Sequence, residues 1–423
     1  MDRRKGMKWV YGLVDMQSFY ASCEAASRPE FAWKRREDDD FTDPPLLVSG
    51  DPARRSGIIL AATPAAKRSG VDNAMRLGEA LQRCPEAIVV KPRMEFYLET
   101  SVRIRRMIEH LFPLHEPFSV DESFFAFPYP SHLFSDPIAA VRELKQTVWD
   151  LFRIRCRIGL GPNKWMAKMA NKQAKKHPDR IVWWTEQDVP TQLHRLSVFD
   201  MWGLKRRAKI LHEEFAARTI GDVAEIPESK LVDRFGVWGT IIHRWSRGED
   251  DSQINPHSCE KPHKGISHRT TLPRDFYKRE EIAVVILELL DEVCRRARSE
   301  GQKGRRVGLG LTYEGLQGGF YKAKTVDFYS DEANEWYPVL LQLLDRWWMG
   351  DGVRAVSVSL DLLQNTNALQ LSLFNDAVKQ NRLSRAVDDI RTKYGEISIM
   401  RAVSLGKAGQ FKERSKKIGG HYM

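Results

Sequence analysis

Cysteines and long apolar runs are scarce in this sequence, and both shortages exclude classes of protein. The 423 residues include five cysteines, widely spaced and without a Cys-x-x-Cys pair, which argues against a disulfide framework and against a zinc site. No apolar signal core follows the charged residues 1–5, and no 18-residue stretch lacks charge, so we expect neither secretion nor a membrane partner. Internal repeats and long low-complexity tracts are also missing. The sequence predicts a soluble, cytoplasmic protein.

The length and the net positive charge of the chain indicate several domains and an anionic partner. A chain of this length is too long for one compact core and indicates about two to four domains. Lys and Arg number 67 against 56 Asp and Glu, which gives a formal net charge of +11. This excess suits a polyanionic partner, although charge alone does not identify nucleic acid.

Two acidic stretches organise the chain. An apolar run predicts a strand that delivers Asp15 at its end and leads into a helix. A second apolar, aromatic run at residues 118–127 carries Asp121 and Glu122, which would cost several kcal/mol to bury unpaired. Three carboxylates from two strands suit Mg²⁺ beside phosphates, and two such ions about 4 Å apart can promote in-line phosphoryl displacement. The alternative is an exposed hairpin end with two solvated acids.

Both stretches resemble motifs of the Y-family (translesion) DNA polymerases. The family motifs read Asp-x-Asp-x-Phe-Tyr/Phe-Ala-x-Val/Cys-Glu and Ser-x-Asp-Glu, and they match residues 15–24 and 119–122 in order and spacing. One position departs, because Gln17 stands where many members have a second Asp. The UmuC-type branch also has an amide there, so the departure points to that branch.

The resemblance implies a two-metal site and a nucleotide site. Two Mg²⁺ ions are expected on the metal ligands Asp15, Asp121, Glu122 and the backbone carbonyl of Met16. Tyr20 matches the steric gate that excludes a ribose 2′ hydroxyl, with Phe19 beside it; the alternative for both is core packing.

Two lysines are expected at the triphosphate of the incoming nucleotide. Lys67 lies in a predicted fingers helix with Thr63 as N-cap, Pro64 at its first position and Gly70 as its end. Lys175 ends a segment that resembles the family's palm motif after the catalytic strand. As isolated residues, both lysines would be assigned to the solvated surface.

Basic residues elsewhere are candidate DNA contacts. Lysines recur at helical spacing over residues 164–175 and line one face. The resemblance of this segment to the family's palm motif implies that Lys168 is a neighbour of the triphosphate contact Lys175. Residues 197–223 resemble the family's helix-hairpin-helix thumb, in which amides at a helix N-terminus hold a phosphate. Any of these side chains could be simply a surface residue. The other candidates are Gly203, Lys205 (in place of the usual second hairpin glycine), Lys264, His268, Arg269, Arg305 and Arg306.

The chain is predicted to be a multidomain α+β protein with a right-hand polymerase fold. The acidic residues 37–40 and the turn at 43–45 are expected to form a solvated loop, followed by a strand at 46–48. Helices are expected over residues 96–112 and 137–152, and another in the tail up to about residue 394. The last module shows a βαββαβ order, which matches the family's little finger. The predicted parts are palm (1–22 and 91–188), fingers (23–90), helix-hairpin-helix thumb (189–250), linker (251–264), little finger (265–363) and C-terminal tail (364–423).

The tail contains a short motif for a protein partner. Gln370, Leu371, Ser372, Leu373 and Phe374 match the Gln-Leu-x-Leu-Phe pentapeptide with which bacterial polymerases dock on the sliding clamp. The alternative is an ordinary apolar segment that begins a helix. A UmuD-like or recombinase partner is a further expectation of the UmuC-type branch.

These observations predict a template-directed, low-fidelity DNA polymerase for translesion synthesis in the DNA-damage response. Its substrates would be primer–template DNA and deoxynucleoside triphosphates. The main alternative is a catalytically inactive DNA- and clamp-binding accessory protein with a polymerase fold. Another palm-type enzyme, such as a nucleotide cyclase, would leave the thumb and little-finger modules without a purpose.

Overall fold

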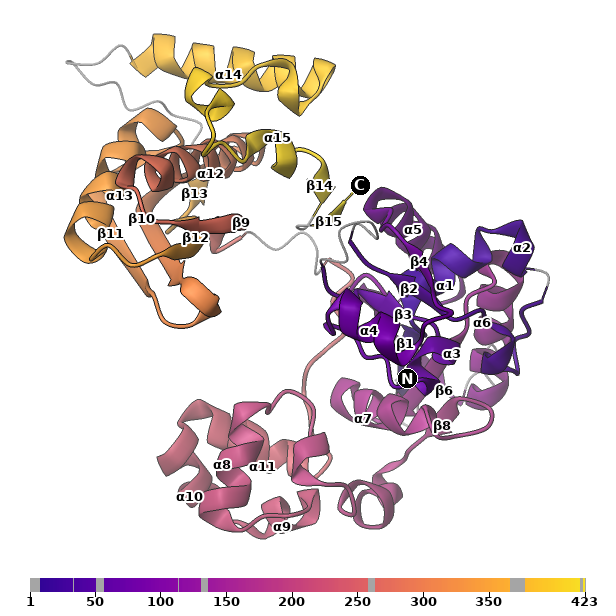
Figure 1. Ribbon diagram of the computed structural model, residues 1–423. Coiled ribbons are helices and arrows are strands. Elements are labelled where there is room, and N and C mark those ends of the chain that lie inside the picture. Colours follow the sequence, from indigo (N-terminus) through magenta and orange to yellow (C-terminus); the bar gives the residue numbers. More distant parts are fainter. Residues whose placement is uncertain are drawn as a thin grey trace, which may run out of the picture. The chain divides into compact units, whose positions relative to one another are not determined.

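The computed structural model divides the chain into two compact units, Met1–Glu260 and Lys261–Met423 (Figure 1). Among the described residues, no helix is long and apolar enough to span a membrane. The described residues are 8–32, 34–50, 57–112, 114–130, 136–257, 263–365, 377–418 and 421–422.

The first unit is built on a five-stranded palm sheet with the order β5-β6-β1-β7-β8. β1 is central and pairs antiparallel with β6 and β7, while β8 pairs parallel with β7 at one edge. The predicted first strand is confirmed, and it extends far enough to include Asp15. The strands are β1 (Lys8–Met16), β5 (Leu114–Pro117), β6 (Glu122–Tyr129), β7 (Cys156–Gly161) and β8 (Ile181–Trp183).

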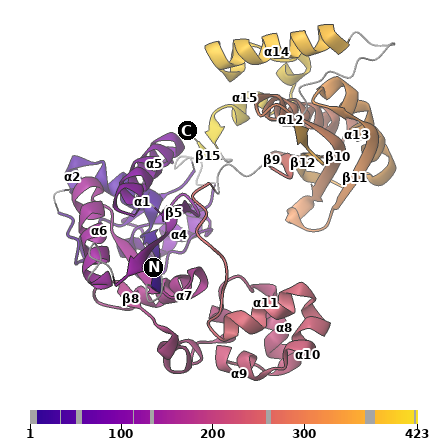
Figure 2. The same cartoon turned by 180° about the vertical axis from the view of Figure 1, so that it is seen from behind.

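Helices cover both faces of the palm sheet (Figure 2). On one face, the helices α5 (Met94–Leu111) and α6 (Pro137–Phe152) were both predicted from sequence, and Phe112 stacks on Phe125 with ring centroids 4.5 Å apart. On the other face, α7 (Lys164–Ala174) packs directly on β1 and β7. Gly159 permits this approach, since a Cβ atom there would lie 2.1 Å from the backbone nitrogen of Asn171.

A small sheet with the order β3-β2-β4 forms the segment expected as fingers. Thr63 precedes α3 as its N-cap residue, and Pro64 is the first helical residue, as predicted. The Thr63 hydroxyl, however, donates to the carbonyl of Pro44 at 2.6 Å and does not cap the helix. The elements are α1 (Phe19–Ala26), α2 (Pro29–Ala32), β2 (Leu46–Val48), β3 (Ala61–Ala62), α3 (Pro64–Arg68), α4 (Leu77–Arg83) and β4 (Ile88–Val90).

The acidic segment 37–43 was expected to be a solvated loop, and this expectation is wrong. Asp43 is buried and accepts hydrogen bonds from two buried guanidinium groups, Arg35 Nε at 2.6 Å and Arg155 Nη1 at 2.8 Å. Asp40 forms an ion pair with Arg180 at 2.7 Å. The acids therefore fasten this segment to the palm, because charges taken out of water need partners.

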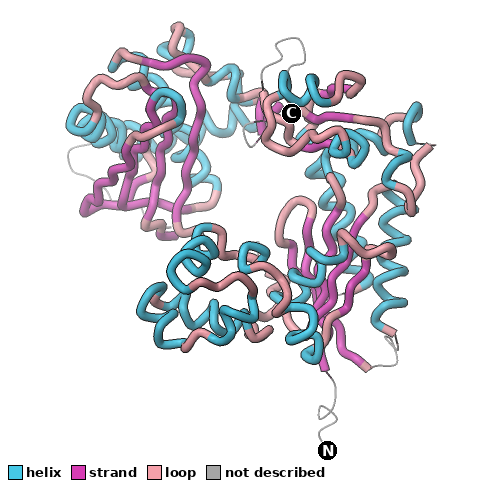
Figure 3. The backbone as a smooth tube through the Cα atoms, turned by 60° about the horizontal axis from the view of Figure 1, so that its bottom comes forward, coloured by secondary structure: helices cyan, strands magenta, loops and turns pink. Residues whose placement is uncertain are grey.

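A cluster of four helices forms the thumb (Figure 3). Its core continues into α7 of the palm through Trp165, Met166 and Met169, and Trp165 stacks on Trp245 at 5.7 Å. The predicted helical thumb is confirmed in its secondary structure. The helices are α8 (Arg206–Phe215), α9 (Ile220–Glu225), α10 (Glu228–Phe235) and α11 (Val237–Ser246).

The start of the predicted linker is bound to the palm. Ile254 packs with Leu13 and Phe124 of the palm sheet. The backbone nitrogen of Asn255 donates to Glu116 Oε2 at 2.7 Å, and the same carboxylate oxygen accepts from Lys164 at 2.7 Å. The polar composition of the segment predicted a linker, and its first residues are docked on the palm by Ile254, by the backbone nitrogen of Asn255 and by Gln253, whose side chain accepts from the Tyr11 hydroxyl at 3.2 Å.

The second unit has the predicted βαββαβ order in one sheet, β11-β10-β12-β9. Two helices bury one face of this sheet over an apolar core. β9, β10 and β11 are longer than the strands predicted at 266–272, 306–313 and 322–327, whereas β12 is shorter than the strand predicted at 353–363. The elements are β9 (Gly265–Phe276), α12 (Arg279–Ser299), β10 (Gln302–Tyr313), β11 (Phe320–Ser330), α13 (Ala333–Trp347) and β12 (Val353–Asp361).

A C-terminal segment packs on this module through polar side chains. The predicted tail helix is α14 (Ala377–Tyr394). It contacts the module through Asp388, which accepts from Arg298 at 2.7 Å, and through Ser384, which donates to Glu332 at 2.7 Å. The short strand β13 (Gln364–Asn365) precedes this helix, and the short elements α15 (Phe411–Arg414), β14 (Lys417–Ile418) and β15 (His421–Tyr422) follow it. The pentapeptide 370–374 lies outside the described residues.

Candidate active site

Asp15 and Glu122 form the centre of the site. They lie directly opposite each other on β1 and β6. Asp121 precedes Glu122 in the turn between β5 and β6, and its carbonyl accepts a hydrogen bond from the Met16 backbone nitrogen at 2.9 Å. The sheet register thus brings the three predicted metal-binding carboxylates to one sheet end.

Each of the two facing carboxylates has a cation of its own. Asp15 accepts from Arg157 on β7 at 2.7 Å, and Glu122 accepts from Lys168 on α7. Burial raises the pKa of the Asp15 carboxyl to about 7, while Arg157 opposes this rise and nearby Glu122 adds to it. The pair is therefore charge-balanced by protein side chains.

The carboxylates suit a hard divalent cation in their chemistry. Asp15 is 7% exposed, and a buried carboxylate beside a second one attracts Mg²⁺ when its remaining neighbours are oxygen atoms. The side chains of the described residues do not already converge as a three-ligand cage, since Arg157 and Lys168 occupy two of the acids. Asp121 accepts from the Ser119 hydroxyl at 2.7 Å.

A cavity of about 590 Å³ opens beside these acids. It has space for a small phosphorylated ligand, and both anionic and cationic groups face it. The lining includes Asp15, Met16, Gln17, Ser18, Phe19, Tyr20, Asp40, Lys67, Arg68, Asn73, Asp121, Arg157, Lys175 and Arg180.

The two lysines predicted at the triphosphate do meet in this cavity. Lys67 donates to the Ser18 hydroxyl at 3.0 Å. Burial lowers the pKa of Lys67, and the positive charges of Lys175 and Arg157 lower it further. Three cations from three separate segments therefore face one another, an arrangement that favours an anionic ligand.

Tyr20 lines the same cavity. Its ring is stacked on Tyr97, with ring centroids 4.7 Å apart and 18° between the ring planes. This contact holds the Tyr20 ring in position. Burial and then the charge of Asp121 raise the pKa of its hydroxyl. Phe19 also lines the cavity but is only 4% exposed, which supports a mainly packing role.

Gln17 is held by charged neighbours. Its side-chain amide donates to Asp40 at 3.0 Å and accepts from Arg180 at 3.0 Å. An amide can do both at once, whereas an ionised carboxylate can only accept. The departure from the usual Asp is therefore matched by its surroundings.

The lysines of α7 have carboxylate partners. Lys164 pairs with Glu116 at 2.7 Å and Lys172 pairs with Asp200 at 2.6 Å, and Lys168 pairs with Glu122 at the metal site. The predicted basic stripe is real in sequence but is neutralised locally, which leaves Lys175 at the C-cap of α7 to face the cavity.

The thumb hairpin has the backbone expected of its motif. Gly203 has a φ of 91°, and Lys205, at the N-cap of α8, has φ 40° and ψ −108°. That conformation favours glycine, so Lys205 adopts the backbone of the glycine that it replaces.

The little-finger candidates separate onto different faces. Arg269 and Arg306 are exposed, and Arg269 reaches Thr312 at 3.0 Å on the open side of the sheet. His268 lies two residues after the core residue Ile266 on the same strand. Since residues two apart share a face of the sheet, His268 points to the helix-covered face. This placement speaks against the predicted DNA contact at His268.

Two further candidates lie apart from that pair. Arg305 stands at a break in the β10–β11 register, with its guanidinium 5.8 Å from the ring centroid of Tyr329. Lys264 is exposed just before β9.

Sequence reasoning missed Arg157 and Arg180. Arg157 is the second residue of β7 and Arg180 directly precedes β8, and neither belongs to the quoted motifs. The alternation of side chains along β7 would have placed Arg157 on the α7 face. Only the register of β7 on β1 shows that its neighbour across the sheet is Asp15.

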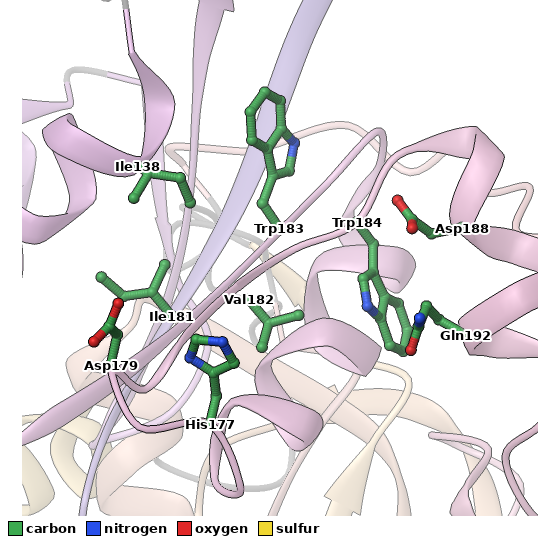
Figure 4. A pocket seen from close by; sticks show the side chains of 9 residues that line it. All are labelled: Ile138, His177, Asp179, Ile181, Val182, Trp183, Trp184, Asp188 and Gln192. Carbon is green, nitrogen blue, oxygen red and sulfur yellow. The ribbon is translucent and has the colours of Figure 1, made fainter.

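A second hollow, of about 390 Å³, lies at the β8 edge of the palm (Figure 4). Trp183 and Trp184 point away from each other there. Its acids already have partners, because Asp179 pairs with Arg142 at 3.7 Å and Asp188 accepts from the Thr185 hydroxyl at 2.8 Å. The residues that line this hollow include no lysine or arginine, in contrast to the several cations of the first cavity.

Comparison with protein families gives two matches. Residues 14–172 match the impB/mucB/samB family, and residues 263–373 match the C-terminal domain of the same family. The first match contains all three carboxylates, and the second covers the little-finger module and the first four residues of the pentapeptide.

Similar proteins cover nearly the whole chain. "DNA polymerase IV 2" of Halalkalibacterium halodurans is 39% identical over 98% of this chain and 100% of its own length. A Bacillus subtilis protein named for UV-damage repair, UvrX, is 32% identical over 96% of each chain. A solved chimera of the Y-family polymerases Dbh and Dpo4 has the same fold, with a TM-score of 0.66, 22% identity and coverage of 84% of this chain and 100% of its own.

Proposed function

The chain belongs to the Y family of DNA polymerases, and from this premise we propose that it extends primers across damaged template positions. It is a DNA-directed DNA polymerase that acts on DNA and nucleotides and uses divalent metal. The observation that carries the proposal is the position of Asp15 opposite Glu122, beside a cavity that Lys67 and Lys175 also face.

Asp15, Asp121, Glu122 and the carbonyl of Met16 are proposed to hold two Mg²⁺ ions. When bound, these ions would favour attack by the primer 3′ hydroxyl and stabilise the leaving phosphate oxygen. The protein's own contribution is to fix the acids in register on β1 and β6. Residues around the cavity then orient the nucleotide.

Tyr20, Lys67 and Lys175 are proposed to select and hold that nucleotide. Tyr20 is braced by Tyr97, which makes its ring a firm barrier to a 2′ hydroxyl. The lysines would bind the triphosphate, since an ammonium group suits phosphate as a point charge.

DNA binding is proposed to involve the thumb hairpin at Gly203 and Lys205, with Lys168 near the reacting phosphates. In the second unit, Arg269 and Arg306 are the preferred backbone contacts, and Lys264 and Arg305 remain candidates. Contacts of this type hold phosphates without reading sequence. A roomy site and phosphate binding are compatible with damaged templates.

The pentapeptide at 370–374 is proposed to dock on a sliding clamp. Leu371, Leu373 and Phe374 would enter an apolar groove, where such anchors typically cost about 2 kcal/mol or more when truncated. Replacing Leu373 and Phe374 by Ala should remove stimulation by a loaded clamp without changing synthesis on a short primer–template. Membership of the UmuC-type branch, a UmuD-like or recombinase partner and a cytoplasmic location stay predictions.

The competing function is an inactive DNA-binding accessory protein. Intact carboxylates at all three positions favour an active enzyme. Primer extension with Mg²⁺ on intact and lesion-bearing templates separates the two, because an accessory protein would bind both templates and extend neither.

A further inference from the structure

Arg157 is a cation that the quoted motifs do not include. It lies on β7 directly opposite Asp15 on β1, while Glu122 lies opposite Asp15 on the other side, on β6. Asp15 therefore stands between a carboxylate and a guanidinium in the same row of the sheet. All three side chains point to the α7 face, because they occupy equivalent pleat positions.

The contacts of Arg157 divide between the metal site and α7. Its Nη2 atom donates to Asp15 Oδ2 at 2.7 Å, and its Nε atom donates to Asn171 Oδ1 at 3.2 Å. Asn171 is itself fixed, since its amide donates to the carbonyl of Leu13 at 3.1 Å and to that of Arg157 at 3.0 Å. Asn171 can thus anchor one side of the guanidinium while the other side changes partner.

Arg157 also belongs to the cavity. It lines the same space as Lys67 and Lys175, and its charge is among those that lower the pKa of Lys67. Arg157 has a carboxylate partner, whereas Lys67 makes its hydrogen bond to a neutral hydroxyl at Ser18. Arg68 and Arg180 also line this cavity. A triphosphate entering it would therefore meet, beside these two arginines, two lysines and one guanidinium bound to a metal ligand.

Divalent metal and Arg157 compete for the same carboxylate. A cation binding at Asp15 would be repelled by a guanidinium held 2.7 Å from that acid. Phosphate is an equally good partner for arginine, because its oxygens match the planar fork of donors. A nucleotide that arrives with metal thus brings a cation that competes with Arg157 for Asp15 and a phosphate that can bind Arg157 in place of Asp15.

We propose that Arg157 exchanges partners during nucleotide binding. In the metal-free protein it neutralises Asp15 and holds this carboxylate in place. When metal and nucleotide enter together, it releases Asp15 and binds a triphosphate oxygen beside Lys67 and Lys175, still anchored by Asn171. This makes Arg157 a positioning and nucleotide-binding residue, and the inference rests on the proposed polymerase function.

The exchange predicts effects of opposite sign in one variant. Arg157→Gln removes the charge but keeps a polar side chain. Binding of Mn²⁺ alone, followed by electron paramagnetic resonance, should tighten by roughly tenfold because the competitor is gone. Binding of a deoxynucleotide to the complex with chain-terminated primer–template should weaken by roughly tenfold, because one phosphate contact is lost.

Two further variants control the experiment. Arg180→Gln removes another cavity cation, one that pairs with Asp40 and Gln17 and with no metal ligand, so the affinity for Mn²⁺ alone should stay within about twofold of the parent. Arg157→Lys keeps the charge and should leave Mn²⁺ affinity near that of the parent. It also tests the exchange if Arg157→Gln fails to fold, since looser binding of nucleotide with unchanged metal affinity is then expected.

A change of the same sign in the affinities for metal and for nucleotide would overturn the inference. If Arg157→Gln weakened metal and nucleotide binding together, Arg157 would be only a structural brace of the site; if neither affinity changed, it would have no part in binding. A parent protein that binds no Mn²⁺ and extends no primer would instead refute the proposed function. The two failures are therefore distinguishable.

Discussion

Asp15 and Glu122 face each other across β1 and β6, yet each carboxylate is bound to a different cation, Arg157 for the first and Lys168 for the second. Two acids this close would repel each other if both were ionised and unpaired. The cations allow the acids to be kept in register before any metal is bound. The site is therefore preorganised by the palm sheet and α7.

Tyr20 supplies the first prediction. Replacing Tyr20 with Ala should raise the ratio of kcat/KM for ribonucleotides to that for deoxynucleotides by about tenfold or more, because the ring beside the sugar is gone. Phe19→Leu is the matched control, since Phe19 is buried and packs, and it should alter this ratio little. An unchanged ratio in Tyr20→Ala would assign Tyr20 to packing against Tyr97.

Lys67 and Lys175 should both act on the nucleotide. Replacing either with Ala ought to raise the KM for nucleotide by about tenfold, or to lower kcat if the contact tightens only in the transition state. Steady-state kinetics at several salt concentrations provide the measurement. A change confined to DNA affinity and its salt dependence would mean that the lysines contact the DNA backbone instead.

Lys205 should be strained in the thumb hairpin. Lys205→Gly is expected to stabilise the protein by about 1 kcal/mol, because glycine adopts its backbone angles without a steric penalty. Lys209→Gly is the matched control within α8 and should destabilise by about 1 kcal/mol. Urea unfolding of the full chain measures both, and a less stable Lys205→Gly variant would contradict the strain.

His268 predicts a pH dependence of stability. Burial, then the charges of Arg414 and Arg296, lower its pKa to about 4, from about 6.5 when unfolded. The folded state thus prefers neutral histidine, so the stability it contributes is complete above about pH 6.5 and is lost as the pH falls towards 4.

The loss should be about 1 kcal/mol, given the partial exposure of the ring. His268→Asn cannot titrate and should show a smaller drop in melting temperature between pH 7.5 and pH 5. Equal drops in parent and variant would show that His268 is not the titrating group.

Much of the fold could be predicted because local patterns and tertiary structure agree. The spacing of apolar residues placed α5, and α6, the strand β2 at Leu46 and the βαββαβ order were also predicted. The three carboxylates could be assigned because they belong to short motifs. They come together because β1 and β6, which carry or border them, are adjacent strands.

The rest depended on long-range pairing, which no local pattern encodes. Asp43 looks like a turn residue in sequence, but it is buried and accepts hydrogen bonds from Arg35 nearby and from Arg155, more than a hundred residues away in the sequence. His268 looks like one more basic residue beside Arg269, yet strand alternation turns it to the helices. Arg157 has no motif at all, and only the register of β7 on β1 shows that it opposes Asp15.

The central claim is that nucleotidyl transfer requires the carboxylates of Asp121 and Glu122, which are proposed to hold the metal ions. Primer extension by purified Asp121→Ala, Glu122→Ala and parent protein tests it most directly, with Glu116→Gln as the control acid, since Glu116 binds Lys164 and Asn255 outside the metal site. We predict extension by parent and Glu116→Gln, a loss of at least about a hundredfold in the other two, and nearly equal primer–template affinity in all four. Robust extension by Asp121→Ala or Glu122→Ala would contradict the account.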